Sequence, residues 1–397
     1  MNQTTQQLLS LLKLSLKDRQ HFHQEESVSL EEYEAIFDLA EKHEVLVLLD
    51  NILNYDLLSL ALQNRLFKKT AQTVQKGIKL QVMNTQINNL LLNKNIDAIT
   101  LKGYSIARFY PVPEYRKSTD IDLLLLDKDQ LAQAEQLLYS NGFTRSNDQF
   151  GNHHIVMMSE DGETLELHTS LAIDFKDDRL NDYLSWMHKQ SRKHCYTYKD
   201  EEHSIIVYDT AWQGFYLMVH MIQHFVGSGF GLRNLCDWVV LWQNCEEESE
   251  REEFWQMAQE SGTMEFAATI TAICVDKLGL DLIKSPVPQE DLASKIQADE
   301  LLEDILNAGE FGYSESDRMV GMQGNSFRAY VKEFHYQMHT NFPKAGRYFI
   351  LWPALWMATG IRFLRNNRKL NRPPLRQIIK KAGERGKLVD QLMPKKK

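Results

Sequence analysis

The sequence has few of the residues that build disulfide-rich, fibrous or disordered proteins. Only four cysteines occur, and no two of them form a C-x-x-C pair: Cys195, Cys236, Cys245 and Cys274. This spacing favours free thiols in a reducing cytoplasm over a disulfide or zinc framework. Nine prolines and nineteen glycines in 397 residues are too few for a collagen-like or a proline-rich disordered chain.

The start of the chain also lacks the features of a secretory signal. The opening residues, MNQTTQQLLSLL, contain no basic segment and no cleavage site, so we expect no signal peptide. Hydrophobic residues make up 43% of the chain and charged residues 25%, which is typical of a globular protein with a sizeable core. We therefore expect a cytoplasmic protein of two or three structural units.

Charge is distributed unevenly along the chain. From residue 341 to the end there are fifteen Lys and Arg residues and two acids, a net charge of +13. The remainder has thirty Lys and Arg residues and fifty-two acids, a net charge of −22. An acidic body with a basic tail predicts that the tail contacts something anionic.

Hydrophobic periodicity divides the chain into four parts. Residues 1–95 have apolar residues at helical spacing and predict an N-terminal helical region. Residues 96–205 contain alternating, strand-like segments with helices between them, and predict a small α/β domain. Residues 206–340 are helical again, and residues 341–397 form the basic, aromatic-rich tail. The expected fold class is α+β, a small mixed-sheet domain flanked by N-terminal and C-terminal helical regions.

Two acids stand close together on one predicted strand. In Asp120-Ile121-Asp122 both carboxylates project to the same face, because successive strand side chains alternate. Neighbouring carboxylates repel each other unless a cation lies between them. Mg²⁺ prefers carboxylate oxygens together with the phosphates of a substrate, so this pair predicts a magnesium site.

A second signal precedes the acid pair. A short strand is predicted to end at Leu101, and Lys102-Gly103 then leads into a helix predicted over residues 104–110. A strand, a glycine and a helix start in this order offer backbone N–H groups to phosphate.

Together these residues resemble a known family. The pattern is similar to that of a poorly characterised bacterial nucleotidyltransferase family in the DNA polymerase β-like superfamily: Leu101-Lys102-Gly103, then Tyr110-Pro111-x-Pro113-x-x-Arg116-x-x-x-Asp120-Ile-Asp122. The chain departs from the superfamily pattern in having Gly103-Tyr104 instead of Gly-Ser or Gly-Gly, and in the longer interval from Gly103 to Asp120.

The resemblance implies a function and a set of site residues. It implies metal-dependent transfer of a nucleoside monophosphate, with ATP as the default donor, to a hydroxyl group, with release of pyrophosphate. Asp120 and Asp122 would hold Mg²⁺ or Mn²⁺. Lys102, Gly103 and Arg116 would bind the nucleotide, and Arg116 is favoured because its fork suits phosphate oxygens.

A third carboxylate is expected on a later strand. Residues 164–168 alternate, so Glu166 and His168 share one face. In the superfamily the third acid lies on such a strand, and Glu166 matches it as a third metal ligand or as the catalytic base. A solvent-facing acid on a hairpin is the alternative.

Further polar residues lie on the helices that follow. His220 and His224 stand at i and i+4, a spacing that can hold zinc, but the glutamate of H-E-x-x-H and a third ligand are missing. The favoured interpretation is therefore that they are core histidines or histidines that support the residues of a site. Arg233 and Asp237 are equally compatible with a helix salt bridge and, by resemblance to the family, with lining of the cleft. The residues assigned to this cleft are His168, His224, Arg233 and Asp237.

The tail and the acceptor leave several alternatives open. Residues 348–361 are apolar for fourteen residues, too short for a bilayer span of about 20 residues. A core helix, a membrane-surface helix and a nucleic-acid-binding edge all fit, although the acidity of the chain argues against extended nucleic acid. Family resemblance allows a small molecule, a glycan precursor, a tRNA or a protein as acceptor. The alternative function is a non-catalytic nucleotide-binding or scaffold protein on the same fold, held at a membrane by the tail.

Overall fold

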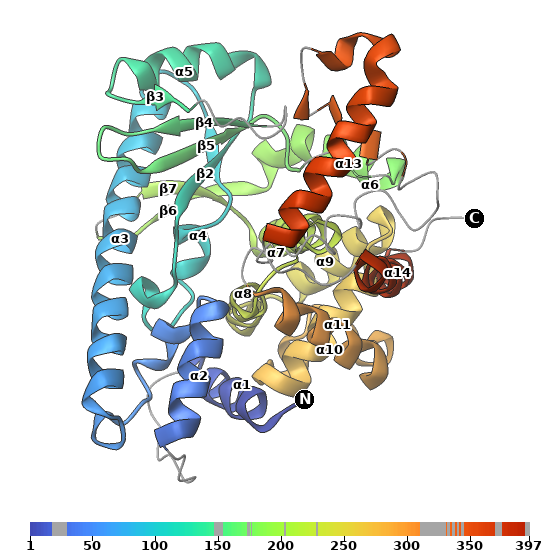
Figure 1. Ribbon diagram of the computed structural model, residues 1–397. Coiled ribbons are helices and arrows are strands. Elements are labelled where there is room, and N and C mark those ends of the chain that lie inside the picture. The colour runs from blue at the N-terminus through green and yellow to red at the C-terminus, as the bar shows by residue number, and fades with distance from the viewer. Residues whose placement is uncertain are drawn as a thin grey trace.

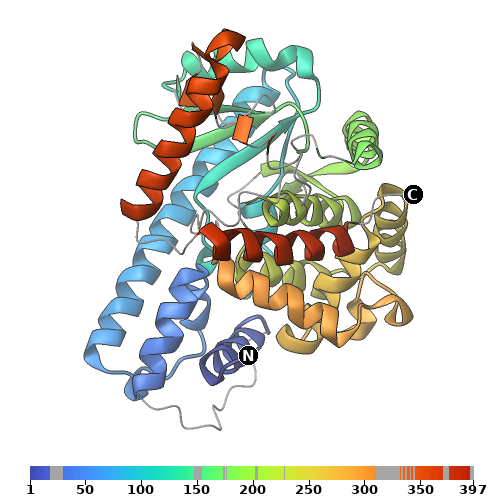
Figure 2. The same cartoon turned by 45° about the vertical axis from the view of Figure 1, so that its right-hand side comes forward.

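The computed structural model describes residues 1–17, 30–146, 154–172, 175, 177–201, 204–227, 229–309 and, with gaps, 331–393. A sheet domain lies on one side of the molecule and a helical body on the other (Figure 1). The long helix α3 runs along the outer side of the sheet domain (Figures 1 and 2).

Helices build the first part of the chain. The helix α3 (Leu60–Leu92) is 33 residues long, and the side chain of Ser59 caps it by accepting a hydrogen bond from the backbone of Leu62. It ends before Asn95, which has a φ of 57°, a left-handed conformation that asparagine tolerates. The other elements of this part are α1 (Gln3–Ser15), α2 (Leu30–Lys42) and the short 3₁₀ turns η1 (Leu46–Leu49) and η2 (Tyr55–Leu57).

The sheet has five strands in the order β1-β2-β5-β4-β3. Its strands are β1 (Ala98–Thr100), β2 (Asp120–Leu125), β3 (Thr144–Arg145), β4 (His154–Met158) and β5 (Thr164–His168). The central pair β2 and β5 is parallel and the other pairs are antiparallel. A parallel pair needs a long crossover connection, and here α5 (Leu131–Tyr139) and the β3–β4 strands provide it.

Apolar side chains on one face of this sheet pack under two helices. Leu123 and Leu165 of the central strands are fully buried and belong to the same cluster as Leu80 of α3 and Leu138 of α5. Each buried leucine contributes about 1.5–3 kcal/mol through removal of apolar surface from water. The helices α3 and α5 therefore cover one face of the sheet and hold its strands in place.

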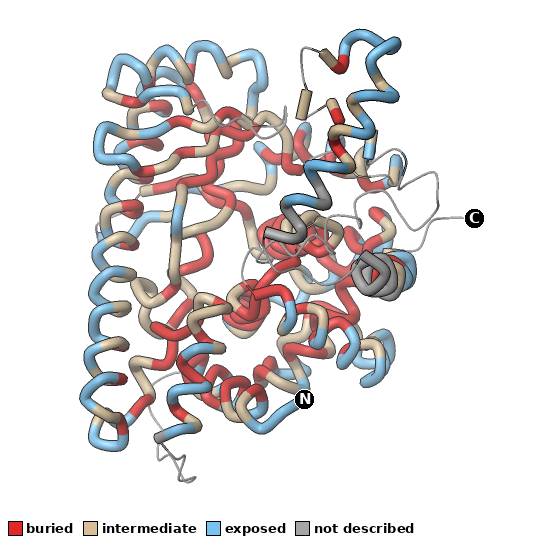
Figure 3. Tube along the Cα trace, in the orientation of Figure 1, coloured by how far each residue is buried: buried red, intermediate tan, exposed pale blue. Residues whose placement is uncertain are grey.

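The C-terminal half of the described chain is a helical body. Its helices are α6 (Asp178–Gln190), α7 (Thr210–Val226), α8 (Leu232–Gln243), α9 (Glu248–Ser261), α10 (Met264–Leu278), α11 (Lys295–Ala308), α13 (Trp352–Lys369) and α14 (Leu375–Leu392), and a hairpin of β6 (Cys195–Lys199) and β7 (Ser204–Tyr208) precedes α7. Buried aromatic residues fill its centre, among them Trp212, Trp238 and Trp242. The helices α7 and α8 are buried along most of their length (Figure 3).

The structure confirms the expected α+β fold with a mixed sheet, and all four cysteines are unpaired. Two local expectations are corrected. The helix expected over residues 104–110 is only α4 (Tyr104–Ala107), because Pro111 and Pro113 disfavour helical backbone just before them.

The alternative of a buried core helix at residues 348–361 is wrong for Ile350 and Met357, which are exposed. Within the described residues, no helix has the length and apolarity needed to cross a membrane.

Candidate active site

The acid pair lies at the start of the interior strand β2, next to the helical body. Asp120 is half-buried at the start of the strand, whereas Asp122 is only 1% exposed. The parallel pairing of β2 with β5 sets Glu166 directly beside Asp122. Carboxylate oxygens of Asp120, Asp122 and Glu166 lie within 4.8 Å of one another. The structure thus brings together the three acids that the sequence singled out.

Two cationic groups flank these acids. The ammonium of Lys102 lies 3.2 Å from Oδ2 of Asp122 and 3.8 Å from Oδ2 of Asp120. Nε2 of His168 lies 3.1 Å from Oδ1 of Asp122 and 3.3 Å from Oε2 of Glu166. The buried acids are therefore balanced by positive charge from β5 and from the turn after β1.

The titration of these groups reflects their mutual attraction. Burial alone would lower the pKa of Lys102, but the surrounding carboxylates outweigh it and raise the pKa above 10.5. Burial would also lower the pKa of His168, but hydrogen bonds to Asp122 and Glu166 raise it to about 9. Burial would raise the pKa of Glu166, whereas His168 and Lys102 hold it below 4.5. Lys102 and His168 are thus positively charged at neutral pH and Glu166 is ionised.

Gly103 forms the turn between β1 and α4. Its φ of 71° and ψ of −120° lie in a region that side chains avoid, which explains why glycine stands there. The helix that it precedes has only four residues, so its dipole is small. Any phosphate held at this turn would rely on backbone N–H groups and on Lys102.

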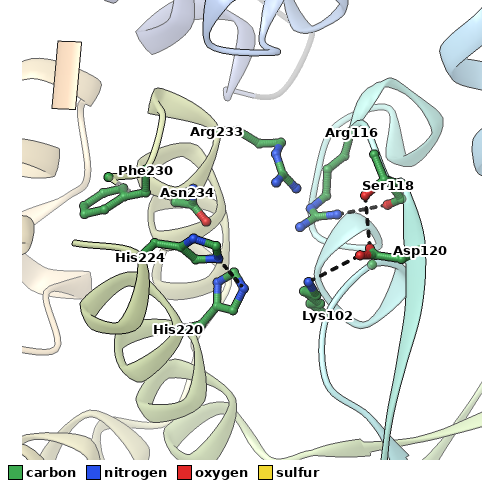
Figure 4. A pocket seen from close by; sticks show the side chains of 12 residues that line it. Lys102, Arg116, Ser118, Asp120, His220, His224, Phe230, Arg233 and Asn234 are labelled. Carbon is green, nitrogen blue, oxygen red and sulfur yellow. Dashed lines mark hydrogen bonds and ion pairs between the residues drawn. The ribbon is translucent and has the colours of Figure 1, made fainter. Parts of the chain in front are cut away.

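A pocket opens between Asp120 and the helical body. In Figure 4 one wall carries Lys102, Arg116, Ser118 and Asp120, and the facing wall carries His220, His224, Phe230, Arg233 and Asn234. The first wall comes from the segment between β1 and β2, and the second from α7 and α8. The pocket therefore joins two parts of the chain that are distant in sequence.

Arg116 is engaged at the back of this pocket. Its Nε and Nη2 donate to the two carboxylate oxygens of Asp237 at 2.7 and 2.8 Å, and both side chains are buried. The hydroxyl of Tyr110 donates to the same carboxylate at 2.7 Å. The guanidinium of Arg116 thus forms a bidentate ion pair with Asp237 on α8. Its Nη1 donates to Oγ of Ser118 at the pocket wall.

The remaining residues predicted on the helices also reach the pocket. Arg233 extends across it toward the wall of Arg116 (Figure 4), and its Nη1 donates to the backbone carbonyl of Lys117 at 3.3 Å. Nε2 of His220 and Nε2 of His224 are 3.2 Å apart. Burial, together with the charges of Lys102 and Arg233, lowers the pKa of His224 to about 4, so it is neutral.

Among the described residues, only two groups of three or more side chains have metal-ligand geometry. One is the acid trio, and the other is His154, Glu166 and His168. The pair His220 and His224 on α7 belongs to neither group. His154 was not singled out from the sequence, although a signal existed. A hairpin turning at residues 160–162 places His154 opposite His168, which is the observed register.

The acid trio fits a hard divalent cation. All of its donor atoms are carboxylate oxygens, which Mg²⁺ and Mn²⁺ prefer. Oδ2 of Asp122 is buried and has the ammonium of Lys102 at 3.2 Å, so a cation bound by the trio would share this oxygen with Lys102.

A family model described as uncharacterised nucleotidyltransferase matches residues 29–279. The chain belongs to this family. The matched range contains every residue of the pocket and of the acid trio. Membership in a nucleotidyltransferase family implies a nucleotide substrate, but the family description names neither donor nor acceptor.

A crystal structure of an antigenic nucleotidyltransferase-like protein from Paracoccidioides brasiliensis is similar at 16% sequence identity, covering 46% of this chain and 88% of that chain, with a TM-score of 0.30. A similarity of this size supports no conclusion about the site. A comparison with curated proteins gives no match.

Proposed function

We propose that this nucleotidyltransferase-family protein transfers AMP from ATP to a hydroxyl group of an acceptor and releases pyrophosphate. The observation that carries the proposal is the convergence of Asp120, Asp122 and Glu166 beside a cation-lined pocket. A divalent cation held by these carboxylates would neutralise charge on the triphosphate and on the leaving pyrophosphate. Mg²⁺ or Mn²⁺ fits the oxygen donor set.

The side chains of the pocket have distinct roles in this proposal. Lys102 and Arg233 supply the positive charge that faces the pocket, and the backbone at Gly103 allows close approach of phosphate. Arg116 acts through its contact with Asp237, since this pair fixes the segment that leads into Asp120. His168 balances the charge of Asp122 and Glu166 and holds both carboxylates in place.

The bond changes follow from this arrangement. The acceptor oxygen forms a bond to the α-phosphorus of ATP, and the bond from that phosphorus to the pyrophosphate oxygen breaks. The proton of the acceptor hydroxyl passes to a carboxylate of the acid trio. Glu166 is ionised at neutral pH and can accept it.

The test uses the purified full-length chain with labelled ATP and Mg²⁺ or Mn²⁺ in a cell extract. We expect release of pyrophosphate and a labelled product heavier by one AMP, identified by mass spectrometry. Asp120→Asn, Asp122→Asn and Glu166→Gln should each reduce this transfer at least a hundredfold, as expected for residues that hold or accept charge in the reaction. Asp129→Asn, an exposed acid just beyond β2, is the matched control. Wild-type transfer by Asp122→Asn would refute the proposal.

A non-catalytic nucleotide-binding role is the second candidate, and one observation favours it. The three acids already have positive partners in Lys102 and His168, so the cluster is charge-balanced without a metal. Isothermal titration with ATP in the presence of Mg²⁺ or of a chelator distinguishes the two roles. Binding that is indifferent to Mg²⁺, with no pyrophosphate released for any acceptor, would favour the binding protein.

A further inference from the structure

An apolar stripe is exposed on the helix α13 and the turn before it. It consists of Ile350, Pro353, Ala354, Met357 and Ile361, which we call the α13 stripe. The spacing of Pro353, Ala354, Met357 and Ile361 places them on one face of α13. Ile350 stands in the 3₁₀ turn η10 (Phe349–Leu351) just before the helix. Ile350 is 77% exposed, Met357 65% and Ile361 51%. Large aliphatic side chains gathered on one exposed face are unusual on a globular protein and mark an interaction site.

The opposite face of α13 already has neighbours. The indole of Trp352 donates to the carbonyl of Gly346 at 2.8 Å, and the indole of Trp356 donates to Nδ1 of His335 at 3.2 Å. Thr359 on the same side is buried. These contacts fix which face turns outward, and Figures 1 and 2 show α13 on the outside of the molecule in both views. Figure 3 shows exposed residues along it.

The surroundings of the stripe are positively charged. Arg362 and Arg365 follow its last residue and are exposed. Arg347 precedes its first residue and is also exposed. The sequence from 341 to 383 contains ten Lys and Arg residues and no acid. The stripe is therefore an aliphatic surface within a positively charged segment. The remainder of the chain is strongly acidic.

We propose that the α13 stripe docks on the surface of an anionic phospholipid membrane. The helix would lie in the plane of the interface, with Ile350, Met357 and Ile361 in the acyl boundary and the arginines at the headgroups. Aliphatic burial and attraction to anionic lipid act together in such a contact. The acidic remainder of the chain favours an orientation with the body away from the bilayer.

Other occupants fit the surface less well. A second copy pairing through the same face would bring two basic segments of like charge together. Nucleic acid would be contacted through arginines and aromatic stacking. Tyr348 and Phe349 before the stripe are exposed, but the large exposed side chains of the stripe itself, Ile350, Met357 and Ile361, are aliphatic. The proposal concerns where the protein is held and is independent of the nucleotidyl-transfer proposal.

The experiment is flotation of the full-length protein with vesicles. One set contains phosphatidylcholine alone, and the other contains phosphatidylcholine mixed with phosphatidylglycerol. We expect binding to the mixed vesicles only, weakened by salt. Met357→Glu with Ile361→Glu should reduce the partition coefficient at least tenfold. Arg362→Gln with Arg365→Gln should reduce it roughly fivefold for each arginine removed.

The control is a charge placed on an unrelated exposed side chain. Ile283 is 81% exposed on η6 (Leu282–Lys284). Ile283→Glu adds one negative charge, as each substitution in the stripe does, but leaves the stripe intact. It should leave vesicle binding unchanged. Circular dichroism and the melting temperature of each variant verify that it folds, as expected for exposed positions.

Several results would overturn the proposal. These are equal binding to both kinds of vesicle, wild-type binding by Met357→Glu with Ile361→Glu, and loss of binding in Ile283→Glu to the same extent. A dimer in light scattering that dissociates in the Met357→Glu, Ile361→Glu variant would assign the stripe to a second copy instead. Binding to nucleic acid that needs the arginines but not the aliphatic residues would assign it to nucleic acid.

Discussion

The ammonium of Lys102 lies 3.2 Å from Oδ2 of Asp122. Lys102 stands in the turn after β1, and Asp122 stands on β2, so the contact bridges two adjacent strands of the sheet. The same ammonium lines the pocket. It is therefore placed between the acids that would hold a cation and the space that would hold a phosphate.

This placement predicts opposite effects of Lys102→Met on two ligands. Removal of a positive charge beside the carboxylates should raise the affinity for Mn²⁺ by at least about fivefold, because charges this close interact by on the order of 1–4 kcal/mol. The affinity for an ATP analogue should fall, because a phosphate partner is lost. Isothermal titration measures both. Lys79→Met, which removes a lysine paired with Asp161, is the control and should change neither affinity. An unchanged Mn²⁺ affinity in Lys102→Met would show that the ammonium of Lys102 does not repel a cation held by the three carboxylates.

The buried pair of Arg116 and Asp237 predicts a large loss of stability on removal of one partner. Asp237→Asn leaves the guanidinium buried without a counter-charge, and we expect a cost of about 3–5 kcal/mol in the free energy of unfolding. Arg192→Gln removes the more exposed member of the pair with Asp97 and should cost less than about 1 kcal/mol. Urea unfolding followed by tryptophan fluorescence compares the two. If Asp237→Asn and Arg192→Gln lowered the free energy of unfolding equally, water would have to reach the guanidinium of Arg116 and replace the lost carboxylate.

His43 predicts part of the acid sensitivity of the fold. It is fully buried, and burial, with a smaller contribution from Lys42, lowers its pKa from 6.5 to about 4. Its Nδ1 accepts a hydrogen bond from the backbone of Leu232, which requires this nitrogen to be unprotonated. Because the unfolded chain binds this proton more readily, stability is lost as the pH falls below 6.5 and levels off below about 4. The loss from this residue is on the order of 3 kcal/mol.

The measurement is the free energy of unfolding between pH 7 and pH 4 in the wild type and in His43→Gln, whose amide can still accept a hydrogen bond. The variant should lose this part of the pH dependence. Parallel curves for the two proteins would show that His43 does not titrate in this range.

Two glycines in helices predict opposite outcomes for the same substitution. A Cβ at Gly214 of α7 would lie 2.3 Å from the ring of Trp242, whereas a Cβ at Gly383 of α14 meets no atom within 4 Å. Gly214→Ala should therefore destabilise the protein by about 1–3 kcal/mol through overpacking. Gly383→Ala should stabilise it by up to about 1 kcal/mol, since alanine is the better helix former. Melting temperatures measure both changes, and a neutral Gly214→Ala would show that Trp242 can move aside.

Local patterns were readable because they depend on neighbouring residues. The alternation of Asp120, Ile121 and Asp122 placed both acids on one face of a strand, and the helical periodicity of residues 1–95 predicted the helical region that contains α3. The same patterns overextended the helix after Gly103, because periodicity continued into a segment that Pro111 and Pro113 end.

Contacts between residues that are distant in sequence could not be predicted from local patterns. The fork of Arg116 suggested phosphate, but its observed partner is Asp237, 121 residues later in the chain. The apolar run at residues 348–361 was compatible with a core helix and with a surface helix, and only packing decides between them. Exposure depends on which neighbours a helix finds, and sequence spacing does not specify these neighbours.

The sequence by itself determined the fold class, the face shared by Asp120 and Asp122, and the resemblance to a nucleotidyltransferase family. These features arise from backbone geometry and from short motifs, which act over a few residues. Only the tertiary structure decided that β2 pairs with β5 in the register that sets Glu166 beside Asp122, and that α7 and α8 close the pocket. Strand register and burial depend on the packing of the whole chain, because each contact forms only when the elements around it are in their native positions.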